Sequence, residues 1–373
     1  MRLYIDGLFY KGSGIGRYYE SLTKEFAKRG IKIYTCVCKN LKSNFEKDFA
    51  GISDIVPIFV DYEKFSIKGF FKQSKILKKL ENEVDLFFYP HINLPYYIPQ
   101  NTIATIHDLT PFTSYWDRNE VKRKIFLFYL KRALKYSAKI IAVTNTIANE
   151  LKLTFKWLKK DIEVIYEFVE DKFTINYRQD KPIFNKPYLL FVGNRKKHKN
   201  IELLINAFSK IKHNIPHYLI IAGSKEKDND YVDISVKNLG VKDRVIEFIQ
   251  PSDETIINLY TFADLFVFPS LFEGFGLPPL EAVNLGCPVI LSDIPALREI
   301  FGESCLYFDP HNVNNLAETI LKVIYDRNFR KELLKKQQER LKIFDKDRII
   351  NKYIELFDKI RFTKVIHESS TFR

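Results

Sequence analysis

The stretch from Phe262 to Ala282 constrains the fold of this chain more than any other, because it combines a buried strand, a glycine turn and a helix start. Leu265-Phe-Val-Phe268 is a short apolar run, typical of a strand buried on both faces of a parallel sheet. Gly274 and Gly276 follow, where backbone N–H groups can approach a ligand without a Cβ between them. Pro278-Pro279 then opens a helix, where a missing N–H costs little.

The same stretch offers a site for an anion. Free N–H groups at a helix start and the helix dipole both favour negative charge. Two carboxylates, Glu273 and Glu281, lie on either side of the turn, and beside a phosphate they are better suited to bind hydroxyl groups than to pair with a charge. The chemistry predicts a site for a sugar diphosphate nucleotide. The alternative is an ordinary strand–turn–helix unit of any α/β protein, and one Gly-x-Gly alone would indicate no more than that.

The residue order around these glycines narrows the interpretation. Glu273-Gly-Phe-Gly-Leu-Pro-Pro-Leu-Glu281, followed by Gly286-Cys-Pro-Val-Ile290 and Pro295-Ala-Leu-Arg-Glu299, resembles the Glu-x7-Glu signature of the family 4 retaining glycosyltransferases. The resemblance implies an α/β protein of GT-B fold. In that fold two Rossmann-like domains face each other across a deep cleft, and a C-terminal helix crosses back to the first domain.

The resemblance also assigns roles to residues of this stretch. It implies that Glu273 contacts hydroxyls of the donor sugar and that Glu281 binds the ribose. It also implies that the sugar and the diphosphate contact the backbone of four residues, Gly274, Phe275, Gly276 and Leu277.

The length of 373 residues allows two domains, each with its own core. Residues 166–187 are charged, lack a periodic pattern and contain two prolines, as linkers do. We therefore expect an N-terminal acceptor domain at 1–175 and a nucleotide-sugar donor domain at 176–345, with a returning helix at about 346–373. No site is predicted in Tyr166-Glu-Phe-Val169, where the family usually has an Asn-Gly turn.

A second glycine turn, Lys11-Gly-Ser-Gly-Ile-Gly-Arg17, lies between the first predicted strand and a helix expected from Tyr18. The pattern fits any close approach of backbone to a ligand. No acidic residue ends the second strand to bind an adenosine ribose, which argues against NAD. In the family that the chain resembles, this loop touches the diphosphate and the acceptor, which implies donor contacts for Gly14 and Gly16. Arg17 is either an acceptor-side residue or a surface residue at the helix start.

His107 and Asp108 follow a predicted strand at 101–106, at the sheet edge where α/β proteins bind ligands. A lone His at a strand end is often only a structural hydrogen bonder. Thr105-Ile-His-Asp-Leu-Thr-Pro111, however, resembles the Thr-x-His-Asp-Leu-x-Pro of family members that use mannose-type donors. The resemblance implies that His107 approaches the donor sugar near its anomeric carbon, and that Asp108 orients His107 or faces the acceptor.

A basic run, Asn194-Arg-Lys-Lys-His-Lys-Asn200, follows the strand that ends at Gly193. Such charge focused at a helix start suits a phosphate, whereas scattered surface lysines would not be focused there. The run resembles the family's Gly-x4-Arg-Lys-Asn, in which a basic pair neutralises the leaving diphosphate; Lys199 matches it, and Arg195 is the candidate second cation because His198 stands where Arg is common.

Ile249 and Gln250 lie at the end of a later predicted strand. In the family that the chain resembles, residues at this strand end line the base pocket through their backbone groups. Ile249 replaces a usual glycine there, so the base is left open.

The net charge of +13 suits nucleic acid, an anionic membrane or acidic substrates. No nucleic-acid-binding motif accompanies it, so we favour peripheral contact with the inner face of the plasma membrane. The helix expected at 119–138 carries Lys124, Phe128, Lys131 and Lys135 at helical spacing, which fits an interfacial helix or a solvated face equally well. The four cysteines read as reduced core residues, and the N-terminal strand pattern shows no leader, so a cytoplasmic location is expected.

These observations predict a glycosyltransferase that moves a hexose from a nucleotide sugar to a glycan or lipid-linked acceptor in cell-surface polysaccharide synthesis. The family resemblance implies that it retains the anomeric configuration. Mannose from GDP-mannose ranks first as donor, and His107, Lys199 and Glu273 are the predicted catalytic residues. No cofactor and no metal is expected, because no Asp-x-Asp is placed to hold one and Lys199 can carry the diphosphate charge. The alternatives are a nucleotide-sugar epimerase or hydrolase of the same fold, or a basic nucleic-acid-binding protein.

Overall fold

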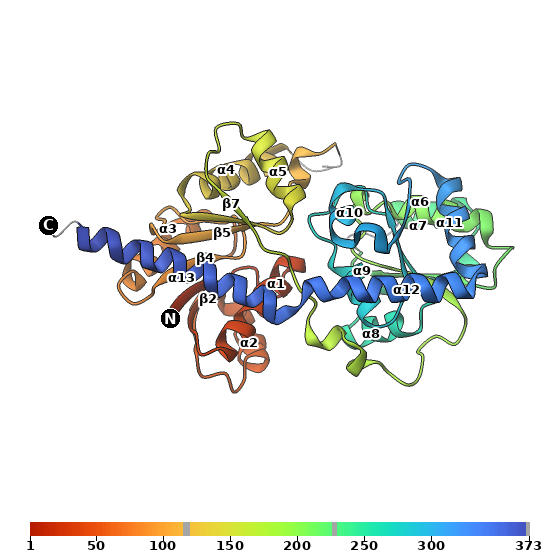
Figure 1. Cartoon of the computed structure of the whole chain (residues 1–373), viewed down its shortest axis with the longest axis horizontal. Coiled ribbons are helices and arrows are strands. Elements are labelled where there is room, and N and C mark those ends of the chain that lie inside the picture. Colours follow the sequence, from red (N-terminus) through yellow and green to blue (C-terminus); the bar gives the residue numbers. More distant parts are fainter. Residues whose placement is uncertain (115–119, 226–229, 371–373) are drawn as a thin grey trace. The chain divides into compact units, whose positions relative to one another are not determined.

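A computed structural model describes residues 1–114, 120–225 and 230–370 of the chain (Figure 1). The chain forms two compact units. Unit 1 consists of three segments of the chain, Met1–Pro111, Arg118–Glu167 and Lys346–Arg373. Unit 2 consists of Phe168–Asp345 with a short segment from Phe112. The sequence predicts the boundary between the first and second domains after residue 175, whereas in the structure the chain passes from unit 1 to unit 2 after Glu167.

Unit 1 is built on a parallel sheet with the strand order β3-β2-β1-β4-β5-β6-β7. The strands are β1 (Arg2–Asp6), β2 (Lys32–Cys38), β3 (Ile55–Val60), β4 (Leu86–Tyr89), β5 (Thr102–Ile106), β6 (Lys139–Ala142) and β7 (Ile162–Val164). The helices are α1 (Ser13–Lys28), α2 (Lys42–Asp48), α3 (Ile67–Leu80), α4 (Glu120–Tyr136), α5 (Asn145–Thr154) and α13 (Lys346–Ser370). The strand order reverses between β1 and β4, which is the point where α/β sheets of this kind bind ligands.

Unit 2 repeats this plan with a parallel sheet of order β10-β9-β8-β11-β12-β13. The strands are β8 (Tyr188–Val192), β9 (Tyr218–Gly223), β10 (Val245–Ile249), β11 (Leu265–Phe268), β12 (Val289–Ser292) and β13 (Leu306–Phe308). The helices are α6 (Ile201–Ile211), α7 (Tyr231–Asn238), α8 (Asp253–Phe262), α9 (Leu277–Asn284), α10 (Pro295–Phe301), α11 (Val313–Tyr325) and α12 (Arg327–Leu341). Here the order reverses between β8 and β11. Two Rossmann-like units are therefore present, as predicted.

The C-terminal helix α13 belongs to the core of unit 1, and Figure 1 shows it in blue along that unit. Tyr353 and Phe357 are fully buried. The Phe357 ring lies 5.4 Å from that of Phe26 in α1 and 5.6 Å from that of Phe88 in β4. The Tyr353 hydroxyl is hydrogen bonded to the hydroxyl of Tyr18 in α1. The returning helix is thus confirmed as part of the first unit over its described residues; residues 371–373 lie outside them.

Two predicted boundaries differ from the structure. The first helix begins at Ser13 and not at Tyr18, so Gly14 and Gly16 lie in its first turns and not in a loop. Gly16 is required there because a Cβ would lie 2.5 Å from the carbonyl oxygen of Phe9. The helix expected at 119–138 is α4, which is described from Glu120; residue 119 lies outside the described residues.

In the described part of the chain, no helix combines the length and the apolar character needed to span a bilayer.

Candidate functional site

The predicted donor residues of unit 2 gather at the carboxyl edge of its sheet, where β8 and β11 lie side by side. The two strands pair in parallel, with Leu189 beside Leu265 and Leu190 beside Phe266. The loops that follow them therefore leave the sheet at the same edge. The backbone N–H of Leu271 donates to the carbonyl of His198 at 2.7 Å, which holds the loop after β11 against the loop after β8.

Lys199 and Glu273 meet across these two loops. Lys199 Nζ lies 2.6 Å from Glu273 Oε1, and the exposed fractions of the two side chains are 12% and 11%. The same ammonium lies 5.2 Å from the ring centroid of Phe268 at the end of β11. A charge-assisted hydrogen bond of this length with little solvent around it is among the stronger polar contacts in proteins. The cation and the carboxylate that sequence analysis assigned to the diphosphate and the sugar thus form one pair.

The glycine turn before α9 adopts a conformation that requires glycine. Gly276 is the N-cap of α9 with φ +97°, and a Cβ there would lie 2.8 Å from Cδ2 of Leu297. Pro278 and Pro279 lack an N–H, so Leu277 alone among the first three helical residues can donate one. An anion at this helix start would therefore depend on the turn and on Lys199 more than on a full set of helix N–H groups.

The other residues of this turn have mostly buried side chains. Phe275 is buried, and its ring lies 5.7 Å from that of Phe344. The side chain thus serves the core, which is compatible with a role for the backbone alone. Glu281 in α9 is also buried, and it accepts a hydrogen bond of 3.4 Å from the Tyr260 hydroxyl. A buried carboxylate with a hydroxyl partner suits the hydroxyl binding that the resemblance implies.

Arg195 does not lie free at this edge. Its guanidinium has an exposed fraction of 3%; it lies 3.2 Å from a carboxylate oxygen of Asp230 and 3.0 Å from one of Asp233, and it also donates to Glu247. These carboxylates offset the charge that sequence analysis assigned to the diphosphate. Arg195 instead links the loop after β8 to α7 and β10 through these ion pairs. Its charge is therefore already paired and is not available as the second cation of the family pattern.

Two backbone positions complete the edge of unit 2. The backbone N–H of Gly193 donates to the carbonyl oxygen of Ala222 at 2.9 Å. A Cβ on Gly223 would lie only 1.9 Å from the carbonyl oxygen of Gly193. The ends of β8 and β9 therefore approach each other closely. Ile249 is half exposed at the end of β10, and Gln250 follows with φ +48°. Both lie at the carboxyl edge, as expected of residues near a base.

In unit 1, His107 lies at the carboxyl end of β5 with both ring nitrogens in hydrogen bonds. Nδ1 lies 3.0 Å from Oε1 of Glu167, and Nε2 lies 3.0 Å from the carbonyl oxygen of Pro90. A carbonyl and an ionised carboxylate only accept, so this geometry is satisfied when both nitrogens carry a proton. Burial lowers the pKa of His107, but the Glu167 carboxylate and, after it, the Pro90 carbonyl outweigh that effect, so that the net pKa is raised.

Glu167 is the functional residue that sequence analysis missed. It follows β7 in the segment from which no site was drawn, and it is buried. Asp108, which was expected to orient His107 or to face the acceptor, accepts a hydrogen bond from the backbone N–H of Thr110 at 3.0 Å. The ring of Tyr18 lies edge-on to His107, with ring centroids 4.7 Å apart. The signal available in the sequence was a carboxylate directly after a short strand at the ligand-binding edge.

The remaining predicted residues of unit 1 lie in α1. Gly14 has open space around it, and Arg17 is half buried in the first turns of the helix.

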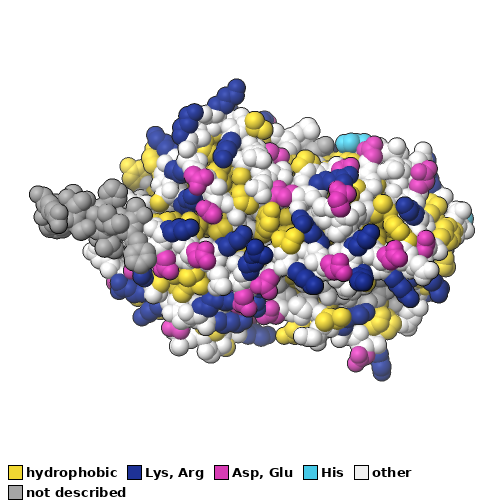
Figure 2. Space-filling view, in the orientation of Figure 1, with side chains coloured by type: hydrophobic (Ala, Val, Ile, Leu, Met, Phe, Trp, Pro, Cys, Tyr) yellow, Lys and Arg dark blue, Asp and Glu magenta, His cyan; other side chains and the backbone are white. Residues whose placement is uncertain are grey.

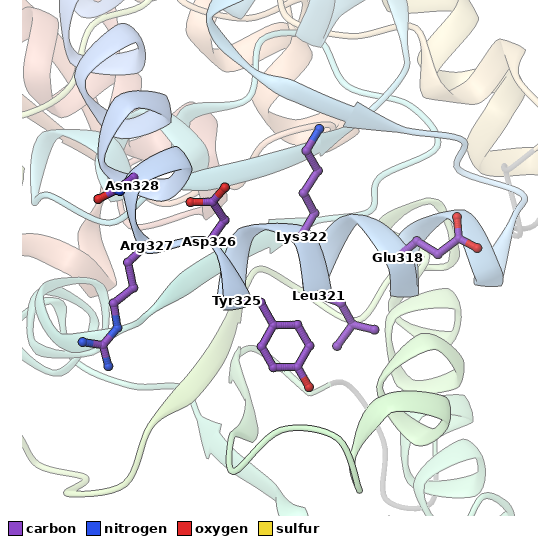
Figure 3. Close-up of a pocket in the computed structure, with 7 residues that line it drawn as sticks. All are labelled: Glu318, Leu321, Lys322, Tyr325, Asp326, Arg327 and Asn328. Carbon is purple, nitrogen blue, oxygen red and sulfur yellow. The ribbon is translucent and has the colours of Figure 1, made fainter.

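Another pocket of unit 2 lies away from this edge. It has a volume of about 890 Å³ at the junction of α11 and α12, and Figure 3 shows Lys322 and Tyr325 pointing to opposite sides of α11. None of its lining residues is among the predicted site residues.

Known proteins with similar sequences identify the family. A profile described as Glycosyltransferase Family 4 matches residues 12–173, and one described as Glycosyl transferases group 1 matches residues 174–340. The chain belongs to glycosyltransferase family 4. Among its relatives, the O-antigen chain mannosyltransferase RfbU of Salmonella typhimurium is 27% identical over 83% of this chain and 87% of its own length. The O-antigen chain mannosyltransferase B of Escherichia coli is 27% identical over 65% of each chain.

Solved structures of low sequence identity share the fold of this family 4 member. Sucrose-phosphate synthase from Thermosynechococcus elongatus matches with a TM-score of 0.77 at 19% identity, over 96% of this chain and 99% of that one. Anabaena Alr3699/HepE in complex with UDP and glucose matches with a TM-score of 0.73 at 16% identity, over 96% and 100%. The fold is GT-B, and the protein is a glycosyltransferase related to enzymes of O-antigen synthesis.

Proposed function

We propose that this family 4 enzyme transfers mannose from GDP-mannose, with retention of anomeric configuration, to a glycan or lipid-linked saccharide. The observation that supports this best is the half-buried Lys199–Glu273 pair at the carboxyl edge of β8 and β11. Relatives named as O-antigen mannosyltransferases favour mannose as the sugar. We place the reaction at the surface of an anionic membrane, where a lipid-linked acceptor would reside.

The pair suggests how the donor enters. Without donor, Lys199 is neutralised by Glu273. An arriving diphosphate offers the ammonium a stronger partner, because it carries more negative charge than one carboxylate. Glu273 is then released to accept hydrogen bonds from hydroxyls of the sugar, while Glu281 holds the ribose. The two charges thus rearrange from each other to the two halves of the donor.

The chemistry follows from leaving-group stabilisation. The bond between the anomeric carbon and the diphosphate oxygen breaks, and the electron pair leaves with GDP. The acceptor oxygen forms the new glycosidic bond on the same face of the sugar, and its proton passes to the departing phosphate oxygen. Lys199 stabilises the charge that grows on the diphosphate. His107, held by two acceptors in its protonated form, suits hydrogen bonding or electrostatic stabilisation and has no free lone pair for proton abstraction.

A thermal-shift screen tests the donor. GDP-mannose, UDP-glucose, UDP-N-acetylglucosamine and dTDP-rhamnose are compared with the wild type and with Lys199→Met. A ligand at 100 times its dissociation constant stabilises the native state by about 2.7 kcal/mol. We expect the shift with GDP-mannose and its loss in Lys199→Met. A shift with another nucleotide sugar alone would overturn the donor, and no shift with any of them would overturn the assignment of the site.

Product analysis tests the reaction itself. Incubation of GDP-mannose with acceptor-bearing membranes is expected to give an α-linked product. Turnover of the donor without acceptor would indicate an epimerase or hydrolase instead.

A further inference from the structure

Large apolar side chains gather on the surface of unit 1 where α3 and α4 lie. Ile67 and Phe71 of α3 are 80% and 53% exposed, and Val121 and Phe128 of α4 are 59% and 49% exposed. Single exposed apolar residues are ordinary, but a contiguous group of them marks an interaction surface. This group comes from two helices that are not adjacent along the chain.

Ring contacts and a groove join these residues into one surface. The rings of Phe70 and Phe128 lie 5.9 Å apart, and those of Phe70 and Phe71 lie 5.3 Å apart, so the two helices share one aromatic cluster. A groove of about 520 Å³ runs between them, with Lys124 as its one charged lining residue among those described. We call this region the α3–α4 surface; it consists of Phe65, Ile67, Phe70, Phe71, Ile125 and Phe128.

The helices that carry the α3–α4 surface are strongly basic. The α3 segment Ile67–Leu80 contains five lysines and no acidic residue, and the α4 segment Glu120–Tyr136 contains six Lys or Arg residues and one Glu. Asp61 offsets part of the charge on α3 by pairing with two of its lysines. Figure 2 shows Lys and Arg side chains gathered over the part of unit 1 that carries α4.

Arg132 shows how cation and ring are combined within this surface. Its guanidinium lies 5.0 Å from the ring centroid of Phe70 and 5.6 Å from that of Phe128, and it donates to the carbonyls of Pro95 and Tyr96. The aromatic cluster is thereby fixed in place without loss of its exposed edges. The chain offers a preformed apolar surface in a basic rim.

We infer that the α3–α4 surface docks onto an anionic phospholipid bilayer, with its apolar side chains in the hydrocarbon boundary and the surrounding lysines against lipid phosphates. An apolar face bordered by lysines is the pattern of helices that lie in a membrane interface. A second copy of the chain fits less well, because a symmetric contact would bring two lysine-rich rims together. The inference rests on the membrane location in the proposed function and not on the transfer reaction.

Vesicle cosedimentation of the full chain tests this surface. Vesicles of phosphatidylcholine alone are compared with vesicles that also contain phosphatidylglycerol. The variant I67S/F71S removes apolar contact and K124E/K131E removes charge; all four residues are exposed, so folding should persist. The matched control is I234S/K237E, which alters one exposed aliphatic residue and one exposed lysine on α7 of unit 2.

We expect the wild type and the control to bind only the vesicles that contain phosphatidylglycerol. Each lysine near such a surface contributes about fivefold to partitioning, so K124E/K131E should bind at least about 25-fold more weakly, and I67S/F71S should lose binding as well. Wild-type binding by I67S/F71S, or no preference of the wild type for the anionic vesicles, would overturn the inference. So would a wild-type dimer in gel filtration that I67S/F71S dissociates, since the surface would then join two copies.

The thermal shift with GDP-mannose separates this inference from the proposed reaction. It should be unchanged in all three variants, because none of them alters the donor residues of unit 2. Loss of vesicle binding with an intact donor shift supports docking alone. Absence of a GDP-mannose shift in the wild type would count against the proposed donor and leave the vesicle result standing.

Discussion

Replacement of Lys199 by Met should reduce the transfer rate far more than it reduces folding. Methionine has a similar length without the charge. The ammonium has an exposed fraction of 12% and already holds a carboxylate at 2.6 Å, so a phosphate oxygen can take the same position. Two unit charges about 4 Å apart at an effective dielectric constant of about 20 interact by about 4 kcal/mol. That energy corresponds to a loss of about 10³ in rate if it is realised fully as charge develops on the leaving group.

Initial rates of mannose transfer from GDP-mannose at saturating donor measure this loss. Lys199→Arg is the matched control, because it keeps the charge, and it should retain part of the rate. The double variant K199M/E273Q should be slower than Lys199→Met, since Glu273 binds hydroxyls of the sugar while Lys199 holds the diphosphate. Circular dichroism checks that each variant is folded. A Lys199→Met enzyme with the wild-type rate would refute the reasoning, because no other part of the proposal supplies the missing charge.

Three further predictions concern side chains whose hydrogen-bond or ion-pair partners are known from the structure alone. Glu167→Gln should remove most of the pH dependence that His107 gives to stability. The pKa of His107 is raised in the folded protein, so the stabilisation is fully present below the ordinary His pKa and is lost as the pH rises through the raised value. The difference in melting temperature between wild type and variant should therefore be larger at acidic than at alkaline pH. A difference that stays constant with pH would contradict the pairing of His107 with Glu167. Arg195→Met should destabilise the protein by about 1.5–3 kcal/mol, because charge-assisted hydrogen bonds to Asp230 and Glu247 are lost while Asp233 keeps Lys225, and an unaltered denaturant midpoint would show that Arg195 is not structural. Tyr353→Phe should cost about 1 kcal/mol through one buried hydrogen bond to Tyr18, measured by urea denaturation, and an unchanged free energy of unfolding would mean that this bond contributes nothing.

Local patterns were sufficient to predict the donor edge of unit 2. The apolar run of β11, the two glycines and the two prolines of α9 each act through their own backbone preferences, so their positions follow from the sequence directly. Lys199 and Glu273 could be assigned to one edge because the loops after neighbouring parallel strands leave a sheet at the same side. The direct contact between them could not be predicted, because it joins residues 74 positions apart.

Long-range partners explain what the sequence did not reveal. The pairing of His107 with Glu167 spans 60 positions, and nothing near Glu167 marks it as a hydrogen-bond acceptor for that ring. The carboxylates around Arg195 lie between 35 and 52 positions away, so an apparently free cation was buried and neutralised.

The position of α13 has a consequence for how the protein is made. Unit 1 needs Tyr353 and Phe357 against Phe26 and Phe88 to close its core, yet these two residues are synthesised only after the long segment of unit 2. The first 167 residues therefore leave the ribosome with an unfilled groove, while the segment Phe168–Asp345 of unit 2 can fold as soon as it has emerged. Completion of the N-terminal half must wait until α13 has been made, so a nascent chain arrested before α13 would expose the very surface that the finished enzyme buries.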